Sequence, residues 1–128
     1  MDTAWGDPYL YHFSQVYVRS DNAYWVAENE DGIIVAGVGV GPLPEASGVC
    51  ELQKMYCLSD YRGTGIAQKL LDTALEFAGN HYSQCYLETR HNMDRAKKFY
   101  EKNGFTYTAE TIGSTGHGGC DYHYIKDL

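Results

Sequence analysis

A glycine-rich turn stands between a strand-like run and a helix-like run near the middle of the chain, and this succession limits the folds that the chain can adopt. The turn, Arg62 to Ala67, reads Arg-Gly-Thr-Gly-Ile-Ala. Val49 to Leu58 before it has the alternation of a strand, and Ile66 to Ala78 after it repeats apolar residues at helical spacing. A further strand-like run follows from Tyr82 to Thr89. Strand, helix and strand over this length predict a parallel strand pair, with the helix packed by its apolar stripe on a sheet.

The segments before the turn predict a hairpin. Tyr24 to Glu30 and Ile33 to Val40 are rich in Val, Ile and aromatic residues, and they flank Asp31-Gly32, a dipeptide typical of tight hairpins. Alternate glycines in and just after the second run predict a twisted or bulged strand: Gly37, Gly39 and Gly41. The first 23 residues show no consistent period, so we expect an irregular or reduced N-terminal segment there.

The segments after the turn predict one more helix and two short strands. We expect Gly79-Asn80 to end the first helix. A second helix should run from about Met93 to Lys102, with Asn92 as its N-cap. Two strand candidates and the glycine-rich loop between them complete the chain: Phe105 to Glu110, Gly113 to Gly119 and Asp121 to Lys126.

The composition is that of a globular protein of one domain. The chain has 128 residues, of which 44% are hydrophobic, and this is long enough to bury a core without disulfide or metal support. Its 17 acidic and 10 basic residues give a net charge of -7, which disfavours nucleic acid as a partner. No window approaches the ~18 apolar residues that span a bilayer, and the first ten residues do not resemble an export signal. We therefore expect a single cytoplasmic domain, residues 1–128, with no membrane partner.

The cysteines and histidines do not have the spacing of a metal site. The four cysteines lie far apart, without the paired spacing of a zinc site or the density of a secreted disulfide scaffold. Reduced, mostly buried thiols and no metal are therefore expected. The cysteines are Cys50, Cys57, Cys85 and Cys120.

The glycine turn itself predicts a binding site for phosphate. A glycine-rich bend that opens a helix presents unpaired backbone N–H groups at the positive end of the helix dipole. A P-loop would need Lys-Ser or Lys-Thr after its last glycine, but Ile66 and Ala67 follow Gly65. A dinucleotide-binding fingerprint starting at Gly63 would need a third glycine where Gln68 stands. A plain strand-to-helix turn, with glycines chosen for their dihedral freedom, remains the alternative on the residues of the turn alone.

Two motifs together suggest a family. Arg62 to Ala67 matches Arg-x-x-Gly-x-Ala, and Ala96 to Phe105 matches Ala-x-x-x-Tyr-x-x-x-Gly-Phe. In this order, and about 30 residues apart, they resemble the acyl-CoA motif and the following segment of the GNAT superfamily of N-acetyltransferases. The resemblance covers roughly residues 24 to 126. It implies an α/β (α+β) fold: a mixed, mostly antiparallel twisted sheet with a splayed parallel strand pair at its centre and helices packed on it.

The same resemblance implies where the acyl donor, acetyl-CoA, binds. In the family, the pantetheine arm pairs with the strand before the turn, which implies main-chain contacts from Met55, Cys57 and Leu58. The pyrophosphate binds the glycine turn, where glycines allow close approach to the backbone. This implies contacts with the six residues of the turn: Arg62, Gly63, Thr64, Gly65, Ile66 and Ala67.

Three residues are candidates for the chemistry. Tyr100 matches a tyrosine that in many relatives lies near the donor sulfur and protonates the thiolate; alternatively it is a core aromatic residue. Glu51 matches a glutamate that several relatives use as a base, or is a hydrogen-bonded strand residue. His117 lies in the glycine-rich loop and could take up a proton or contact the substrate, unless it is an exposed loop histidine. Weaker candidates are Glu88, Asp121 and His123.

The chain departs from the family in two places. Many relatives place a donor-binding asparagine three residues before the alanine matched by Ala96, but this chain has Met93 there, with Asn92 one residue earlier. Relatives also usually have a strand and one or two helices before the hairpin, and these helices shape the acceptor pocket. With only 23 weakly patterned residues here, either the pocket is more open or a second subunit completes it in a homodimer.

These features predict an acyl-CoA-dependent N-acyltransferase that moves an acetyl group directly to a primary amine in a ternary complex. No cysteine has the Cys-His arrangement of a covalent route. The acceptor would be a small-molecule or peptide amine. Two alternatives stay open: a non-catalytic acyl-CoA-binding or regulatory module, and an N-terminally truncated fragment of an acetyltransferase.

Overall fold

The computed structural model describes residues 12–18, 22–90, 92–108 and 122–128. Its strands and helices are, in chain order, β1 (His12–Val18), β2 (Ala23–Glu28), β3 (Ile34–Pro42), β4 (Val49–Cys57), α1 (Ile66–His81), β5 (Gln84–Thr89), α2 (Asp94–Lys102), β6 (Thr106–Thr108) and β7 (Tyr122–Asp127). They form two compact units, the first made from residues up to 41 with 52–77, and the second from residues 42–51 with 78–128. The predicted loop from Gly113 to Gly119 lies outside the described residues. That the chain is one domain stays a prediction.

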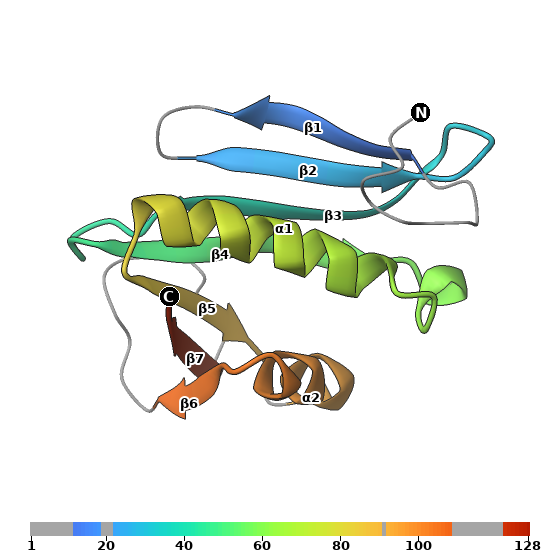
Figure 1. Cartoon of the computed structure of the whole chain (residues 1–128). Helices are drawn as coiled ribbons and strands as arrows, with labels where there is room; N and C mark the ends of the chain where they lie inside the picture. Colours follow the sequence, from blue (N-terminus) through green and yellow to red (C-terminus); the bar gives the residue numbers. More distant parts are fainter. Residues whose placement is uncertain (1–11, 19–21, 91, 109–121) are drawn as a thin grey trace. The chain divides into compact units, whose positions relative to one another are not determined.

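The first unit contains the predicted hairpin. Its strands are ordered β1-β2-β3-β4, with β1 and β3 both antiparallel to β2 (Figure 1). The hairpin turn is longer than the two residues that Asp31-Gly32 suggested. Asn29 closes it, because the side-chain oxygen of Asn29 accepts hydrogen bonds from the backbone N–H groups of Asp31 and Ile33 at 2.9 and 3.0 Å.

The prediction of an irregular N-terminal segment is wrong for residues 12–18. These residues form β1, which pairs with β2 from His12 opposite Glu28 to Val18 opposite Ala23. The register shifts between Gln15 and Tyr17. An extra residue in one strand breaks the period of two, so the sequence of β1 shows no alternation even though the segment is a strand. Residues 1–11 lie outside the described part of the chain.

Helix α1 packs on the first unit by its apolar stripe, as predicted. Ile66, Leu70, Leu71 and Ala74 are all buried, with exposed fractions of 1% or less. The rings of Phe77 and Trp25 on β2 meet edge to face at 5.5 Å, which places the helix on the sheet face of Trp25. In Figure 1 the axis of α1 lies roughly along the direction of β3.

The prediction that Gly79-Asn80 ends α1 is wrong. The helix continues to His81, and the N–H of Tyr82 still donates to the carbonyl of Ala78 at 2.7 Å. Glycine costs a helix only about 1 kcal/mol relative to alanine. Ala78 just before it is fully buried, and the hydrogen bond from Tyr82 to Ala78 retains the last turn of the helix.

Replacing Gly79 with alanine should stabilise the protein by about 0.5–1 kcal/mol, because alanine loses less backbone entropy in a helix. A methyl group there would meet no atom within 4 Å among the described residues, and Gly79 is exposed. The urea midpoint, measured with an unchanged slope, would check this. An unchanged or lower midpoint would mean that the glycine has a role of its own.

The alternate glycines of β3 make room for tyrosine rings. A β-carbon on Gly37 would lie 2.6 Å from the hydroxyl oxygen of Tyr24 and 2.9 Å from a ring carbon of Tyr56. On Gly39 it would lie 2.9 Å from the ring of Tyr24. Tyr24, on β2, is the ladder partner of Gly39. Gly37 and Gly39 therefore serve close packing across strands.

The second unit contains the predicted parallel pair. Its strands are ordered β4-β5-β7-β6, and β7 is antiparallel to both of its neighbours. The parallel β4–β5 ladder has three residue pairs, from Val49–Gln84 to Glu51–Tyr86, and it ends there although both strands continue. The mixed, mostly antiparallel α+β arrangement with one short parallel ladder is therefore confirmed.

Helix α2 begins one residue later than predicted. Its N-cap is Met93, not Asn92, and no side chain caps the helix. The backbone carbonyl of Met93 accepts the first helical hydrogen bond, from Lys97 at 3.0 Å. Asp94 in the first turn supplies the negative charge that favours a helix N-terminus, so a side-chain cap is not required.

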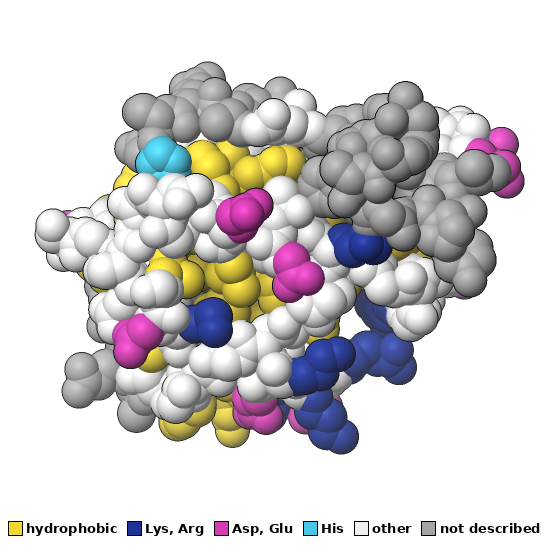
Figure 2. Space-filling model, viewed as in Figure 1, with side chains coloured by type: hydrophobic (Ala, Val, Ile, Leu, Met, Phe, Trp, Pro, Cys, Tyr) yellow, Lys and Arg dark blue, Asp and Glu magenta, His cyan; other side chains and the backbone are white. Residues whose placement is uncertain are grey.

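Helix α2 is anchored on one side and basic on the other. The hydroxyl of Tyr124 on β7 donates to the Glu101 carboxylate at 2.8 Å. The exposed side carries Arg95, Lys98 and Lys102. Figure 2 shows Lys and Arg side chains gathered at the lower right, where α2 lies in Figure 1. Within the described residues, neither helix is long and apolar enough to cross a bilayer.

Candidate active site

The glycine turn of the first unit is held in shape by its own contacts. A short 3-10 helix, Ser59–Tyr61, leads into it, and Gly63 and Gly65 have φ angles of 80° and 89°. Residues with a β-carbon rarely adopt such angles, so glycine is required at both positions. The Thr64 hydroxyl donates to the carbonyl of Tyr61 at 2.5 Å.

The backbone of this turn fits a phosphate-bearing ligand. Arg62 to Gly65 are exposed, and a β-carbon built on either glycine would meet no described atom within 4 Å. Ile66 is only 1% exposed and fixes the start of α1. The first helical hydrogen bond runs from the N–H of Lys69 to the carbonyl of Gly65 at 3.1 Å, so the N–H groups of Ile66 and Ala67 come before any intrahelical acceptor.

Strand β4, which leads to the turn, is locally distorted. Lys54 has a φ of 51°, a left-handed value that costs a non-glycine residue on the order of 1–2 kcal/mol. Met55 and Cys57 beyond it are half-buried. The backbone of Leu58 already has protein partners: its N–H donates to Val35 and its carbonyl accepts from Tyr61, both at 2.9 Å. A hydrogen bond between the acyl donor and the Leu58 backbone would have to share these N–H and carbonyl groups.

Three of the four cysteines lie in the described residues. Burial raises the pKa of the Cys57 thiol, and the nearby Arg62 guanidinium only partly offsets this rise. Cys50 and Cys85 are fully buried thiols that are not in a disulfide. A raised pKa leaves less of the Cys57 thiol as the nucleophilic thiolate.

Tyr100 lies on the inner side of α2 in the second unit. It is 8% exposed, and its ring packs against Phe99 and Phe105 at 5.7 and 5.8 Å. Burial, with a smaller effect from Cys85, raises its pKa to about 12. No described residue accepts or donates a hydrogen bond at its hydroxyl. The group is therefore protonated at neutral pH and able to give its proton to a base.

Glu51 is a buried carboxylate of the second unit. Its side chain is on β4, at the last pair of the parallel ladder, opposite Tyr86. It is 3% exposed, which is unusual for a charged residue and requires polar partners. Both readings of Glu51, base and hydrogen-bonded strand residue, agree with this position.

Three other predicted residues are less informative. Asn92 is exposed in the turn before α2, and its proposed donor contact stays a prediction. His117 and Asp121 lie outside the described residues. Sequence reasoning named Glu88 and His123 only as weak candidates and missed Tyr86, yet the three are in contact on neighbouring strands. The alternation of Tyr86 and Glu88 on β5 was the available signal.

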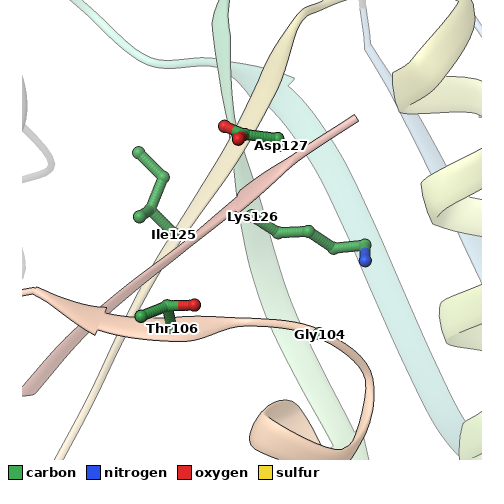
Figure 3. Close-up of a pocket in the computed structure, with 5 residues that line it drawn as sticks. All are labelled: Gly104, Thr106, Ile125, Lys126 and Asp127. Carbon is green, nitrogen blue, oxygen red and sulfur yellow. The ribbon is translucent and has the colours of Figure 1, made fainter.

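A shallow pocket of about 240 Å³ lies at strands β6 and β7 of the second unit. Its lining contains none of the predicted site residues, and Figure 3 shows Lys126 extending away from Ile125 and Asp127 rather than toward a common point. Side chains that do not converge cannot orient a ligand, so we assign the pocket no function. In the described ranges, no three His, Cys, Asp or Glu side chains are grouped as metal ligands.

Above about pH 10 the protein should lose stability. Burial raises the pKa of Tyr100 to about 12, and burial with the hydrogen bond to Glu101 raises that of Tyr124 to about 12. In the unfolded chain both pKa values are about 10. The folded state thus keeps protons that the unfolded state releases, so this contribution is complete below pH ~10 and is lost as the pH rises toward 12. Urea midpoints across this range would show the fall, and Tyr124→Phe should reduce it; a constant midpoint would contradict the assignment.

Comparison with known proteins places the chain in a family. Residues 20–107 match the family model of the acetyltransferase (GNAT) domain. The chain is 42% identical over 124 residues to the uncharacterized N-acetyltransferase YjgM of Escherichia coli, covering 95% of this chain and 74% of that protein. It is 37% identical over 91 residues to the probable N-acetyltransferase camello of Xenopus tropicalis, covering 70% of this chain but 41% of that protein.

Solved structures show the same fold. A GNAT-family acetyltransferase of Staphylococcus aureus superposes with a TM-score of 0.79 at 26% identity, covering 88% of this chain and 71% of that one. The PaiA N-acetyltransferase of Thermoplasma acidophilum, solved with coenzyme A, superposes with a TM-score of 0.66 at 19% identity, covering 84% and 62%. The glycine turn, the buried tyrosine of α2 and these matches together show that the chain belongs to the GNAT family of acetyltransferases.

Proposed function

We propose that the chain transfers an acetyl group from acetyl-CoA to a primary amine, by direct attack and without a covalent enzyme intermediate. The observation that carries the proposal is the glycine turn, whose open backbone suits a pyrophosphate. The neighbour solved with coenzyme A supports the choice of donor. Acetyl-CoA would supply a thioester whose carbonyl carbon an amine can attack.

The turn is assigned the pyrophosphate of the donor. Gly63 and Gly65 leave the backbone open, and the first N–H groups of α1 point toward whatever binds at the helix N-terminus. Arg62 is exposed and supplies a positive charge to the same region. Hydrogen bonds from backbone N–H groups to a charged ligand contribute about 1.5–3 kcal/mol each.

Tyr100 is assigned the protonation of the departing thiolate. Its pKa of about 12 keeps it protonated at neutral pH. The packing of its ring between Phe99 and Phe105 fixes the position of the hydroxyl. A group held in place in this way loses little entropy when it gives up its proton.

The acceptor is proposed to be a primary amine, of a small molecule or a peptide. An amine with a pKa of ~10.4 is mostly protonated at pH 7, so forming the neutral nucleophile costs ~4.6 kcal/mol. The site therefore needs a group that accepts a proton. Glu51, a buried carboxylate, is one candidate.

The proposal is tested by binding and turnover measured together. Millimolar acetyl-CoA should raise the melting temperature, and a panel of amines at pH about 8 should include at least one that is acetylated with release of free thiol. If acetyl-CoA binds and hydrolyses slowly but no amine is acetylated, the chain is a binding module. If acetyl-CoA does not bind, the assignment of the turn is wrong.

A further inference from the structure

On the second unit, the sheet face opposite α2 carries four polar side chains in register. Tyr86 and Glu88 alternate along β5, opposite Glu51 on β4 and His123 on β7. Residues opposite one another in a ladder point to the same side of the sheet. Helix α2 lies on the other side, as its hydrogen bond with β7 shows. We call the contacting residues Tyr86, Glu88 and His123 the β5–β7 network.

The β5–β7 network is a carboxylate–histidine pair supported by a tyrosine. The Tyr86 hydroxyl donates to Glu88 Oε2 at 2.7 Å, and His123 Nε2 lies 3.8 Å from the same oxygen. The rings of Tyr86 and His123 are nearly parallel, with centroids 6.1 Å apart. A carboxylate beside an imidazole orients the ring and stabilises it once the ring has taken up a proton.

The network is largely shielded from water but not sealed from it. The Glu88 side chain is 4% exposed and that of His123 is 13% exposed. Tyr86 also packs in an apolar cluster with Leu43 and Val49. The Glu88 carboxylate is thus held away from solvent, while the imidazole ring of His123 remains partly accessible to solvent.

Few other ionisable groups face His123 on this side. From β5 they are Glu88 and Tyr86, and from β4 the ladder partner of Tyr86 is Glu51. The partner of His123 on β6 is Thr108, which carries no charge. No lysine or arginine on these strands has its register position on this face next to His123, so the charge on this face favours a cationic amine over an anion.

We propose that His123 accepts the proton of the acceptor amine, with Glu88 as its positioning residue; this inference rests on the proposed function. The ammonium group gives one proton to His123, and the neutral nitrogen then bonds to the thioester carbonyl carbon. The carbon–sulfur bond breaks, Tyr100 gives its proton to the sulfur, and the nitrogen's second proton restores Tyr100. His123 releases its proton to water. Acid and base would thus act from the two faces of the sheet.

The test is the pH dependence of acetyl transfer by the full chain and its variants, with two primary amines whose pKa values differ by about 2 units. Each limb of the pH–rate profile, where the rate falls with pH, reports one titrating group. A limb that moves when the amine is changed belongs to the substrate, and a limb that is the same with both amines belongs to the enzyme. His123→Gln should lower kcat by about 10²-fold or more and remove the common limb. Glu88→Gln, whose amide oxygen can still accept from Tyr86, should move that limb to lower pH with a smaller loss of kcat.

His81→Gln is the matched control, because His81 is exposed at the end of α1, and it should leave the profile unchanged. The melting temperature and acetyl-CoA binding of each variant show whether it is folded. If His123→Gln does not fold, the test rests on Glu88→Gln. The inference is overturned if folded His123→Gln keeps kcat within about twofold and the common limb, or if Glu88→Gln leaves the limb in place. If the wild-type chain binds acetyl-CoA but acetylates no amine, the proposed function itself fails, and the inference with it.

Discussion

Replacing Tyr100 with phenylalanine is expected to lower turnover by about 10- to 1,000-fold while the fold is kept. The change removes one hydroxyl, which has no hydrogen-bond partner among the described residues, and it keeps the ring that packs against Phe99 and Phe105. Stability should therefore change little at neutral pH. The loss should appear in kcat, because thiolate protonation takes part in the transition state and not in binding.

The matched control is Tyr107→Phe, which removes the hydroxyl of a tyrosine that is 50% exposed on β6. Single-turnover rates with a good amine would separate chemistry from product release. If Tyr100→Phe and Tyr107→Phe both turn over at the wild-type rate when chemistry limits, Tyr100 is only a core residue. A melting temperature that falls by many degrees would likewise assign it a structural role.

Replacing Gly65 with alanine should weaken donor binding by about 10- to 100-fold, the effect of losing about one hydrogen bond to a charged group. The φ of 89° at Gly65 is strained for any residue with a β-carbon. The backbone would rotate to relieve this strain, and the N–H groups at the start of α1 would point elsewhere. The strain should also reduce stability by about 1–2 kcal/mol.

Calorimetry with coenzyme A measures this effect without depending on turnover. Gly79→Ala is a suitable control, because it makes the same chemical change within α1, at a residue without a positive φ. It should leave affinity unchanged and raise stability. If folded Gly65→Ala protein binds coenzyme A as tightly as the wild type does, the turn only connects β4 to α1 and does not bind the donor.

The sequence predicted elements wherever a local pattern decides the structure. The apolar stripe from Ile66 to Ala78 became the buried side of α1, and Asp31-Gly32 lies in the predicted hairpin turn. Strand, helix and strand after β3 gave the parallel β4–β5 pair. In each case the period or turn chemistry of the segment and its tertiary environment favour the same structure.

The failures occurred where tertiary contacts override local preference. The register shift in β1 removed the alternation by which a strand is recognised. Helix α1 continues past Gly79, although glycine often ends helices, and the hydrogen bond from Tyr82 to Ala78 retains its last turn. Met93 replaced Asn92 as the N-cap because the following Asp94 already supplies a favourable charge.

Motifs predicted the donor side of the site but not the environment of its residues. The spacing of the glycine turn and of Tyr100 could be read directly from the sequence. That Glu51 is buried, or that His123 is opposite Glu88, depends on strand register, which no local pattern fixes. The left-handed backbone of Lys54 had no sequence signal, because lysine is not typical of that conformation.

The packing of Tyr24 over the β3 glycines makes several positions depend on one another. A side chain at Gly37 or Gly39 would occupy the space that the Tyr24 ring fills, so it becomes tolerable only if residue 24 is smaller. Substitutions at these positions should therefore be non-additive in stability, and related sequences should vary there jointly rather than singly. An evolutionary constraint of this kind acts on the set of residues, although each one alone resembles an ordinary strand position.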